Sequence, residues 1–468
     1  MAENNESSKK NTKKTTSEAK KKTTRKKSTT EKAVTKAAKA VAKSNNTALQ
    51  VIVVLLVVAI VGLCVYGYFA GWFDFLFKKP QQPDVIGPNK PNDGINKPYD
   101  SFNAATYNVE TIKDEDLSIH FLELGSWNTG DSIYIKAGET DILIDAGSVG
   151  ASAETIAKYV DQYCTDGKLE YVIATHAHKD HIAGFVGTSA VKGIFERYKC
   201  DNIIQFARTN STTELYKKYV SELDKQKAQG ANVYTALQCW NNADGAKRTY
   251  QISDNVTMDV LYQKFYEEEA KTENNYSVCV MINQGDNHYL FTGDLEEAGE
   301  ASLVANNNLP ECVLYKAGHH GSKTSSNDVL LSVIKPQIVC VCCCAGTDEY
   351  TKTPENMFPT QEFVDRIAPY TDKVYVTTVG GENKTFSSMN GNIVFGCSYV
   401  AKQSGEVATP DSGTTDDKTT ESGTEAKDVE YEYKFSMYFT NNSDKLKDTD
   451  WFKNNRTCPD AWKSKDGN

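Results

Sequence analysis

Apolar residues recur with two different spacings through the middle of the chain. Leu169–Thr175 and Gln337–Cys344 are short runs rich in β-forming residues, a pattern that predicts buried strands. Ser152–Tyr163 and Thr212–Gln229 instead carry apolar residues at helical spacing, each with a Ser or Thr at its start that can cap a helix. The middle of the chain is therefore predicted to contain both strands and helices.

A longer apolar stretch, residues 48–70, contains twenty-three residues without a charge, enough to span a bilayer of about 30 Å. Residues 1–47 hold fourteen Lys or Arg and four Glu, a net charge of +10, and such a tail is predicted to be disordered. Four aromatic residues near the other end of the stretch can form an interfacial belt: Tyr66, Tyr68, Trp72 and Phe73. A buried soluble helix and a cleaved signal peptide are the alternatives, but the basic tail is too long for a signal peptide. We therefore expect one transmembrane helix in the cell membrane, with the N-terminus cytoplasmic and the rest extracellular.

The regions after this stretch differ in composition. Residues 71–108 are rich in Pro and Asn, which is typical of a semi-extended spacer. Residues 401–428 are rich in Ser, Thr, Gly and Asp, which is typical of a flexible linker. These two segments enclose a predicted domain at 109–400. Residues 429–468 begin with a strand-like alternation of apolar residues, and we interpret them as a small C-terminal segment, either a wall- or protein-binding unit or a docking strand.

Metal-ligand chemistry is concentrated in one short motif, H-x-H-x-D-H, which places three of the chain's seven histidines and a carboxylate in six residues. Imidazole nitrogen and carboxylate oxygen are the ligands expected for zinc, iron or manganese. The motif follows a predicted strand, so its side chains would leave the strand's carboxyl end in a tight loop. His176 and His178 can point at one metal. Asp180 and His181, just ahead of a helix predicted from Ile182, can point at a second. A solvated polar loop is the alternative, but this spacing is rare by chance and favours a metal site.

Further candidate ligands follow other apolar runs. Asp294 comes after such a run and is predicted to project from a strand end, where a carboxylate can bridge two cations. His319 or His320 can complete the set of the second metal, and adjacent loop residues leave the choice between them open. Asp145 is placed to orient a ligating histidine from behind, or to cap a turn. Lys316 is interpreted either as a contact for an anionic substrate or as solvated surface.

Five segments, in order, resemble the metallo-β-lactamase fold superfamily, and more narrowly its ComEC-like branch, the hydrolase domain of competence proteins. These segments are Phe121–Gly125 with Gly130–Ile133, Thr140–Gly147, His176–His181, Leu290–Asp294 and Lys316–Ser322. The resemblance covers residues 117 to 397 and implies an α/β fold, the four-layer αββα sandwich, with a metal site at one edge between two sheets. It also implies one or two divalent metal ions, zinc ahead of manganese or iron.

The resemblance has one gap. Most members carry another histidine between the first motif and the bridging carboxylate, Asp294, and here His288 is the only histidine in that interval. We expect His288 to end a hairpin and not to bind metal. The ComEC-like branch has Asn-x-x-Ser at this point, which Asn274 and Ser277 match, so both are expected to support the metal ligands from behind. His120 alternates with apolar neighbours and is predicted to be a core residue.

These features favour a membrane-anchored, extracellular-facing, metal-dependent hydrolase. The leading hypothesis is a phosphodiesterase that acts on DNA or a cell-wall polymer through a metal-bound hydroxide, with Asp180 and Asp294 as its catalytic carboxylates. A hydrolase of a lactone or β-lactam, and a non-catalytic competence-type surface protein, are the alternatives. Subtracting the tail's +10 from the chain's −10 leaves −20 for the rest, so overall charge cannot attract a nucleic acid. The twelve cysteines, four of them in one predicted strand, are expected to be free and not to form a disulfide framework.

Overall fold

The computed structural model of the protein describes residues 103–401 and 431–463. The predicted tail at 1–47, the predicted transmembrane helix at 48–70 and almost all of the spacer and linker lie outside these residues. Within the described ranges, no helix is both long enough and apolar enough to cross a membrane.

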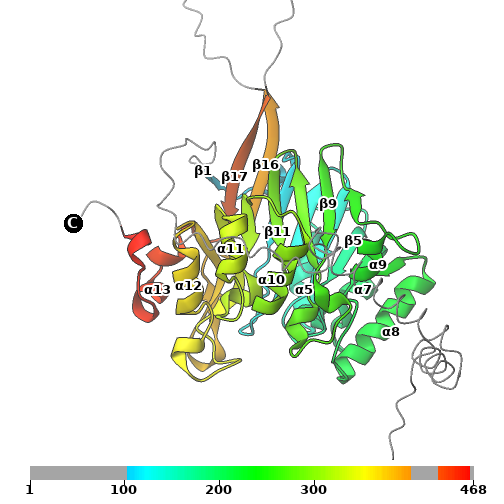
Figure 1. Ribbon diagram of the computed structural model, residues 1–468, viewed down its shortest axis with the longest axis horizontal. Helices are drawn as coiled ribbons and strands as arrows, with labels where there is room; N and C mark the ends of the chain where they lie inside the picture. Colours follow the sequence, from blue (N-terminus) through cyan, green and yellow to red (C-terminus); the bar gives the residue numbers. More distant parts are fainter. Residues whose placement is uncertain (1–102, 402–430, 464–468) are drawn as a thin grey trace, which may run out of the picture. The chain divides into compact units, whose positions relative to one another are not determined.

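Two mixed β-sheets form the centre of the described structure (Figure 1). The first sheet has nine strands in the order β1-β17-β16-β2-β3-β4-β5-β6-β7. Their bounds are β1 (Asn103–Thr106), β2 (Leu117–Phe121), β3 (Ile133–Ala137), β4 (Thr140–Ile144), β5 (Lys168–Ala174), β6 (Lys199–Gln205), β7 (Asn232–Thr235), β16 (Ile393–Ala401) and β17 (Tyr431–Phe439). Strands β4 to β7 run parallel, which places their carboxyl ends at one edge of the sheet.

The second sheet has eight strands in the order β15-β14-β13-β12-β11-β10-β9-β8. Their bounds are β8 (Thr249–Gln251), β9 (Val256–Leu261), β10 (Cys279–Gln284), β11 (Asn287–Phe291), β12 (Leu314–Lys316), β13 (Ile338–Ala345), β14 (Val374–Gly380) and β15 (Phe386–Ser388). Strands β11 to β14 are parallel, so this sheet also presents a row of carboxyl ends at one edge.

Helices accompany both sheets (Figure 1). The α-helices are α4 (Val109–Lys113), α5 (Ser152–Val160), α6 (Lys179–Val186), α7 (Ile194–Arg197), α8 (Glu214–Ala228), α9 (Ala236–Asn241), α10 (Glu297–Asn306), α11 (Asp328–Ile334), α12 (Gln361–Ile367) and α13 (Asp450–Asn455). Short 3₁₀ helices are η1 (Lys264–Tyr266), η2 (Glu273–Tyr276), η3 (Gly318–Gly321), η4 (Pro354–Asn356), η5 (Glu382–Lys384), η6 (Leu446–Asp448) and η7 (Asp460–Trp462). The predicted helices at 152–163 and 212–229 correspond to α5 and α8.

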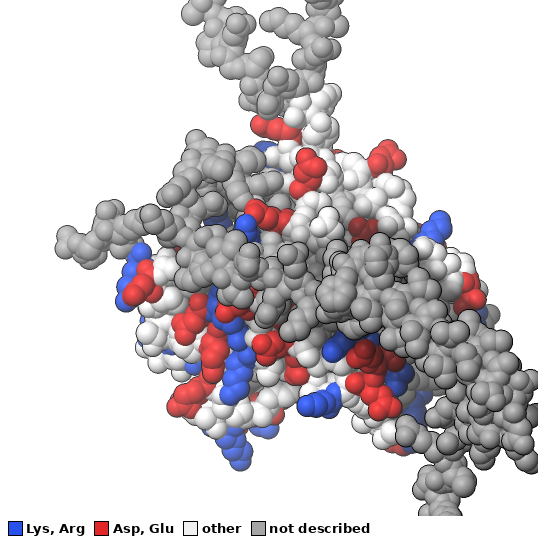
Figure 2. Space-filling view, viewed as in Figure 1, with Lys and Arg blue, Asp and Glu red and all other residues white. Residues whose placement is uncertain are grey.

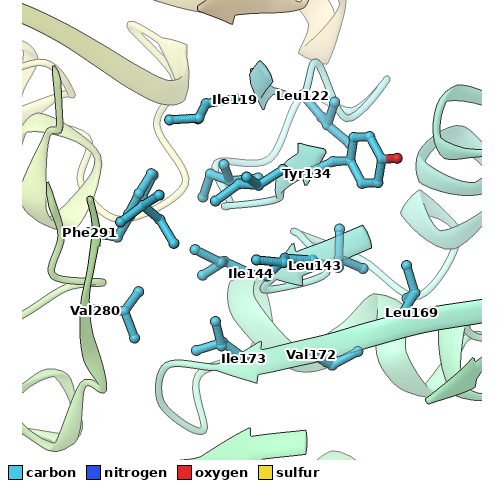
Figure 3. Packing of buried hydrophobic residues seen from close by; sticks show 14 of the residues in the cluster. Ile119, Leu122, Tyr134, Leu143, Ile144, Leu169, Val172, Ile173, Val280 and Phe291 are labelled. Atoms are coloured by element: carbon cyan, nitrogen blue, oxygen red, sulfur yellow. The ribbon is translucent and has the colours of Figure 1, made fainter. Parts of the chain in front are cut away.

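The two sheets share an apolar core because their strands alternate between inward and outward side chains. In Figure 3, Ile144 and Ile173 of the first sheet point toward Val280 and Phe291 of the second, whereas Leu143 lies on the opposite face of its strand. All five of these side chains are buried. The prediction of an α/β fold with two sheets is therefore confirmed.

Strand β13 carries the four clustered cysteines in its interior. Cys340 and Cys342 belong to the core between the sheets, whereas Cys343 belongs to the core under α10, α11 and α12. Cys344 is also buried. The eleven cysteines within the described residues are all free, and burial raises the pKa of Cys342 to about 12. These thiols act as small apolar side chains.

The C-terminal segment contributes a strand to the first sheet. β17 pairs antiparallel with β16 over nine residues, from Ile393 opposite Phe439 to Ala401 opposite Tyr431, and parallel with β1 on its other side. Residues 431–439 are thus part of the sheet and not of a separate unit, and Asn103–Thr106, assigned to the spacer from sequence, forms the strand at its edge. The alternation at 429–439 correctly indicated a strand, but it could not reveal the partner strands.

Candidate metal centre

The candidate centre lies where strands of both sheets end. Because β4 and β5 are parallel neighbours, the residues after them leave the first sheet at the same edge. Asp145 follows β4 and His176 follows β5, and the Asp145 amide donates to the Ile173 carbonyl at 2.9 Å. α6 begins at Lys179, three residues before the predicted start, because the extended residue His178 serves as its N-cap. The Asp180 carboxylate and the His181 imidazole therefore both lie in the first turn of α6.

The second sheet supplies the remaining candidates. Asp294 lies three residues after the end of β11, while His319 and His320 follow the parallel neighbour β12. Gly293 adopts φ +54°, and a Cβ at this position would lie 2.9 Å from Cβ of Thr175, which follows β5 of the first sheet. Glycine is therefore required for the end of β11 to approach the first sheet this closely.

Four buried side chains converge at this edge. The ligand atoms of Asp180, His181, Asp294 and His320 lie within 4.8 Å of one another. His181 Nε2 is 3.1 Å from Asp294 Oδ2, and His320 Nε2 is 3.4 Å from the same oxygen and 3.3 Å from Asp180 Oδ2. His320 Nε2 and Asp294 Oδ1 are buried without a hydrogen-bond partner. Such a donor set fits a divalent cation, which would satisfy these atoms.

The other three predicted ligands surround this group. His176 Nε2 lies 3.8 Å from Asp294 Oδ2 and 3.0 Å from Nδ1 of His178, which is exposed. His319 Nε2 also lies 3.8 Å from Asp294 Oδ2. Five of the other six predicted ligands thus lie around the Asp294 carboxylate, and His178 contacts this group through His176. Of the two adjacent histidines, His320 belongs to the buried group and His319 lies on its more exposed side.

Asp145 holds His181 from behind. Its Oδ2 lies 2.7 Å from His181 Nδ1, and the carboxylate also accepts from the Thr175 amide at 2.8 Å and from the Thr175 hydroxyl at 2.7 Å. Asp145 adopts φ +58°, a conformation that Asp and Asn tolerate better than most residues. With its Nδ1 proton held by Asp145, His181 would present the lone pair of Nε2 to a bound metal ion.

Asn274 and Ser277, in and after η2, also lie behind the ligands. The Ser277 hydroxyl accepts from the Asp294 amide at 3.1 Å and lies 3.4 Å from His176 Nδ1. Asn274 Nδ2 donates to Glu296 at 3.0 Å and lies 3.4 Å from His319 Nδ1. Each of these two residues therefore links its loop to one ligating side chain.

Lys316 differs from both interpretations drawn from the sequence. It is 1% exposed, and its ammonium group forms an ion pair with the buried carboxylate of Asp131. Asp131 Oδ1 also lies 3.0 Å from His320 Nδ1. Because a buried ammonium group is stable only when it is paired, Lys316 is a structural cation beneath the centre, unable to reach a substrate outside it.

Two histidines lie away from the centre. His288, in β11, makes its contact with Asn283 across the hairpin at 2.8 Å. His120 is fully buried between Tyr159 and Ser118, each at 2.8 Å, and burial lowers its pKa to about 3. The usual additional histidine of the superfamily is therefore not replaced by either residue.

The electrostatics of the centre depend on its carboxylates. Burial disfavours charge on the imidazoles of His181 and His320, but Asp294 and the neighbouring carboxylates outweigh burial and raise both pKa values well above the ordinary range. Burial together with His181 lowers the pKa of His176 well below it. Protons on two imidazoles thus offset the carboxylates in the metal-free protein. A divalent cation would replace them, so metal binding releases protons.

One loop over the centre was not identified from the sequence. The hydroxyl of Tyr350, between β13 and α12, donates a hydrogen bond to Asp180 Oδ2. Its neighbour Glu349 accepts from the Thr129 amide at 2.6 Å and pairs with Lys179 at 3.3 Å. Burial and the carboxylates of Asp180 and Glu349 raise the pKa of Tyr350, so the phenol stays a donor. No motif marks this loop, and its only sequence signal is its position after a predicted strand.

A pattern for the metallo-beta-lactamase superfamily matches residues 125–188, which include Asp145 and the whole H-x-H-x-D-H motif. Over these residues the chain resembles the metallo-β-lactamase superfamily. Recombination protein 2 of Haemophilus influenzae is 30% identical over 113 residues, which are 24% of this chain and 13% of that protein. Competence protein ComA of Neisseria gonorrhoeae is 24% identical over 281 residues, 59% of this chain and 33% of that protein.

A third relative carries the name of a nuclease. Exodeoxyribonuclease YycJ of Bacillus anthracis is 34% identical over 68 residues, 14% of this chain and 25% of that protein. In all three comparisons the match spans a third or less of the relative's own length. The predicted resemblance to the metallo-β-lactamase superfamily and its ComEC-like branch is confirmed.

Proposed function

We propose that this protein is a membrane-anchored, extracellular-facing phosphodiesterase that depends on one or two divalent metal ions, zinc first among them. The observation that carries the proposal is the convergence of Asp180, His181, Asp294 and His320 at one buried point. The matches to relatives named as competence, recombination and exodeoxyribonuclease proteins favour a nucleic acid as substrate. A phosphodiester in a cell-wall polymer would present the same chemistry.

In this proposal the cations would activate water and offset charge on the phosphoryl group. The chain's own residues prepare the place for this reaction. Asp145 fixes the ring of His181, Ser277 fixes the amide of Asp294, and Lys316 with Asp131 supports His320 from beneath. Because all of these groups are buried, the ligands keep their positions without reorganising when a substrate binds.

Recognition of the substrate would rest on local contacts. On the face shown in Figure 2, basic and acidic side chains of the described residues are interspersed and form no basic field. Lys179, within the motif, is half-exposed but pairs with Glu349. The region outside the basic tail carries a net charge of −20 by difference. A polyanion would therefore bind with modest affinity and a shallow dependence on salt.

The activity is tested on the metal-loaded protein with three substrates: bis-p-nitrophenyl phosphate, single-stranded DNA and a chromogenic cephalosporin. We expect hydrolysis of the phosphodiesters, loss of this activity in Asp294→Ala, and retention of it in His288→Ala, whose side chain lies outside the centre. Hydrolysis of the cephalosporin alone would replace the proposal by a lactamase-type activity. Full metal occupancy without any turnover would favour a non-catalytic surface protein.

The location is tested separately on intact cells. Protease added outside is expected to remove the metal-binding domain and to leave the lysine-rich residues 1–47 protected, because basic segments stay on the cytoplasmic side. Protection of the metal-binding domain would overturn the proposed orientation, and it would leave the proposed chemistry unaffected.

A further inference from the structure

A loop that covers the candidate centre is attached to both metal motifs. We call residues 346–360, between β13 and α12, the cover loop. Glu349 of this loop pairs with Lys179 of the H-x-H-x-D-H motif at 3.3 Å. Asn356 accepts from Lys323, which follows the His-His-Gly-Ser motif, at 2.7 Å. The cover loop is therefore held in place over the centre from two sides.

Aromatic side chains of the cover loop form its surface next to the ligands. The ring of Phe358 lies 5.5 Å from that of His319 and 6.2 Å from that of His320. The ring of Tyr350 lies 5.4 Å from Phe358. Tyr350 is 49% exposed, although its hydroxyl reaches buried Asp180. Its ring therefore stands at the boundary between solvent and the candidate metal ligands.

The Tyr350 hydroxyl donates to an oxygen of a candidate metal ligand. Its partner, Asp180 Oδ2, lies 3.3 Å from His320 Nε2 and belongs to the group that fits a cation. A substrate bound at the cations would bring an anionic oxygen next to this carboxylate oxygen. A phenol hydroxyl donates one hydrogen bond at a time. Rotation of the hydroxyl about the C–O bond can move this hydrogen bond from the Asp180 carboxylate to a nearby substrate oxygen.

Three lysines near the centre already have partners. Lys316 is buried against Asp131, Lys179 pairs with Glu349, and Lys323 donates to Asn356. Tyr350 differs from them because it is both exposed and in contact with a candidate ligand. It is thus a donor that can reach an anion arriving at the candidate ligands.

We propose that Tyr350 is a substrate-contacting residue whose hydroxyl donates a hydrogen bond to a non-bridging oxygen of the bound phosphodiester. This inference rests on the proposed phosphodiesterase function and names a residue that contacts the phosphoryl group. No proton is transferred in this contact: the phenol remains protonated, and the hydrogen bond moves from Asp180 to the substrate. Cleavage itself depends on the metal ligands.

The test compares Tyr350→Phe with the wild type, both as the full metal-loaded chain. Tyr438→Phe is the matched control, because the Tyr438 hydroxyl also donates to a carboxylate, that of Glu115 at 2.6 Å, in a part of the first sheet without a described contact to the centre. Three quantities are measured: bound metal per chain, affinity for inorganic phosphate by calorimetry, and hydrolysis of bis-p-nitrophenyl phosphate.

We expect Tyr350→Phe to keep its metal and to bind phosphate about ten- to a hundredfold more weakly, the range for a hydrogen bond to a charged oxygen. Its hydrolysis of the diester should fall by a similar factor, whereas Tyr438→Phe should match the wild type in all three measurements. The sulfur of a phosphorothioate diester accepts hydrogen bonds poorly. Removal of the Tyr350 hydroxyl should therefore lower the rate of hydrolysis of this diester less than that of the oxygen diester.

Two results would overturn the proposal. Unchanged phosphate affinity in Tyr350→Phe would show that the hydroxyl does not reach the substrate. Loss of bound metal in Tyr350→Phe would show that the residue acts by positioning Asp180. Phosphate affinity also separates this inference from the proposed function. A wild type that binds phosphate but cleaves no diester would contradict the proposed function. In that case, the phosphate affinity of Tyr350→Phe would still decide whether the hydroxyl contacts the anion.

Discussion

Replacement of Asp145 by Asn tests how the centre holds a ligating histidine. Asparagine tolerates the left-handed backbone conformation at this position, so the change acts on hydrogen bonding. The carboxylate accepts from the Thr175 amide, from the Thr175 hydroxyl and faces His181 Nδ1. An amide has one oxygen only. If that oxygen stays on Thr175, the NH₂ group faces His181 Nδ1, and the ring must place its proton on Nε2, the atom that faces the centre.

The expected loss in metal affinity is about 10- to 100-fold, the range for a residue that supports a ligand from behind, which corresponds to about 1.4–2.7 kcal/mol. Removal of His181 itself should cost more. The assay is competition for Zn²⁺ between the protein and a chromogenic chelator at constant pH. Asp141→Asn is the control: this carboxylate is also buried in β4, but pairs with Lys136 at 2.9 Å and lies toward the opposite end of the strand. Equal losses in both variants, or no loss in Asp145→Asn, would refute the reasoning.

Three further predictions concern other parts of the chain. His178→Ala and Asp180→Ala should each abolish turnover, whereas His288→Ala should keep its metal; loss of one metal equivalent in His288→Ala would identify it as a ligand. Burial lowers the pKa of His120 to about 3, so the stability it contributes is present above its unfolded pKa of about 6.5 and is lost as pH falls. Between pH 7 and pH 5 the free energy of unfolding should therefore fall by about 2 kcal/mol from this residue. Urea unfolding at the two pH values should show this fall in the wild type and not in His120→Gln. An equal fall in both proteins would exclude His120 as the cause. Deletion from residue 402 onward should lower the melting temperature, because it removes β17; an unchanged melting temperature would make β17 dispensable.

The parts of the centre that depend on local spacing could be predicted from the sequence. The H-x-H-x-D-H motif keeps its ligands within a single loop and helical turn, so spacing alone brings them together. Asp145 could be placed because it directly follows a strand whose alternation is readable. Asp294, three residues after β11, could be placed from the apolar run that precedes it.

Features that depend on contacts between distant segments could not be predicted. Lys316 has the composition of a surface residue, and only the fold brings Asp131, 185 residues earlier in the sequence, against its ammonium group. The choice between His319 and His320 depends on two successive left-handed residues, at φ +46° and +53°, which no spacing rule indicates. Tyr350 lies in a loop without a motif. Its role follows from where β13 ends, which is a property of the sheet and not of the local sequence.

The pairing of β1 with β17 affects how the protein folds during synthesis. The neighbour of β1 in the first sheet is β17. Residue 103 therefore cannot pair with its partner until residue 436 has been synthesised. At about 5–20 residues per second, the ribosome needs on the order of half a minute to translate the sequence between them. For most of that time β16 has not been made either, so the edge of β2 is unpaired, and an unpaired edge is prone to aggregation. The metal motifs emerge well before this interval ends, so a nascent chain can carry every ligand while its first sheet still lacks the strand that completes it. Chaperone protection is therefore most needed late in translation, after the candidate centre has been made.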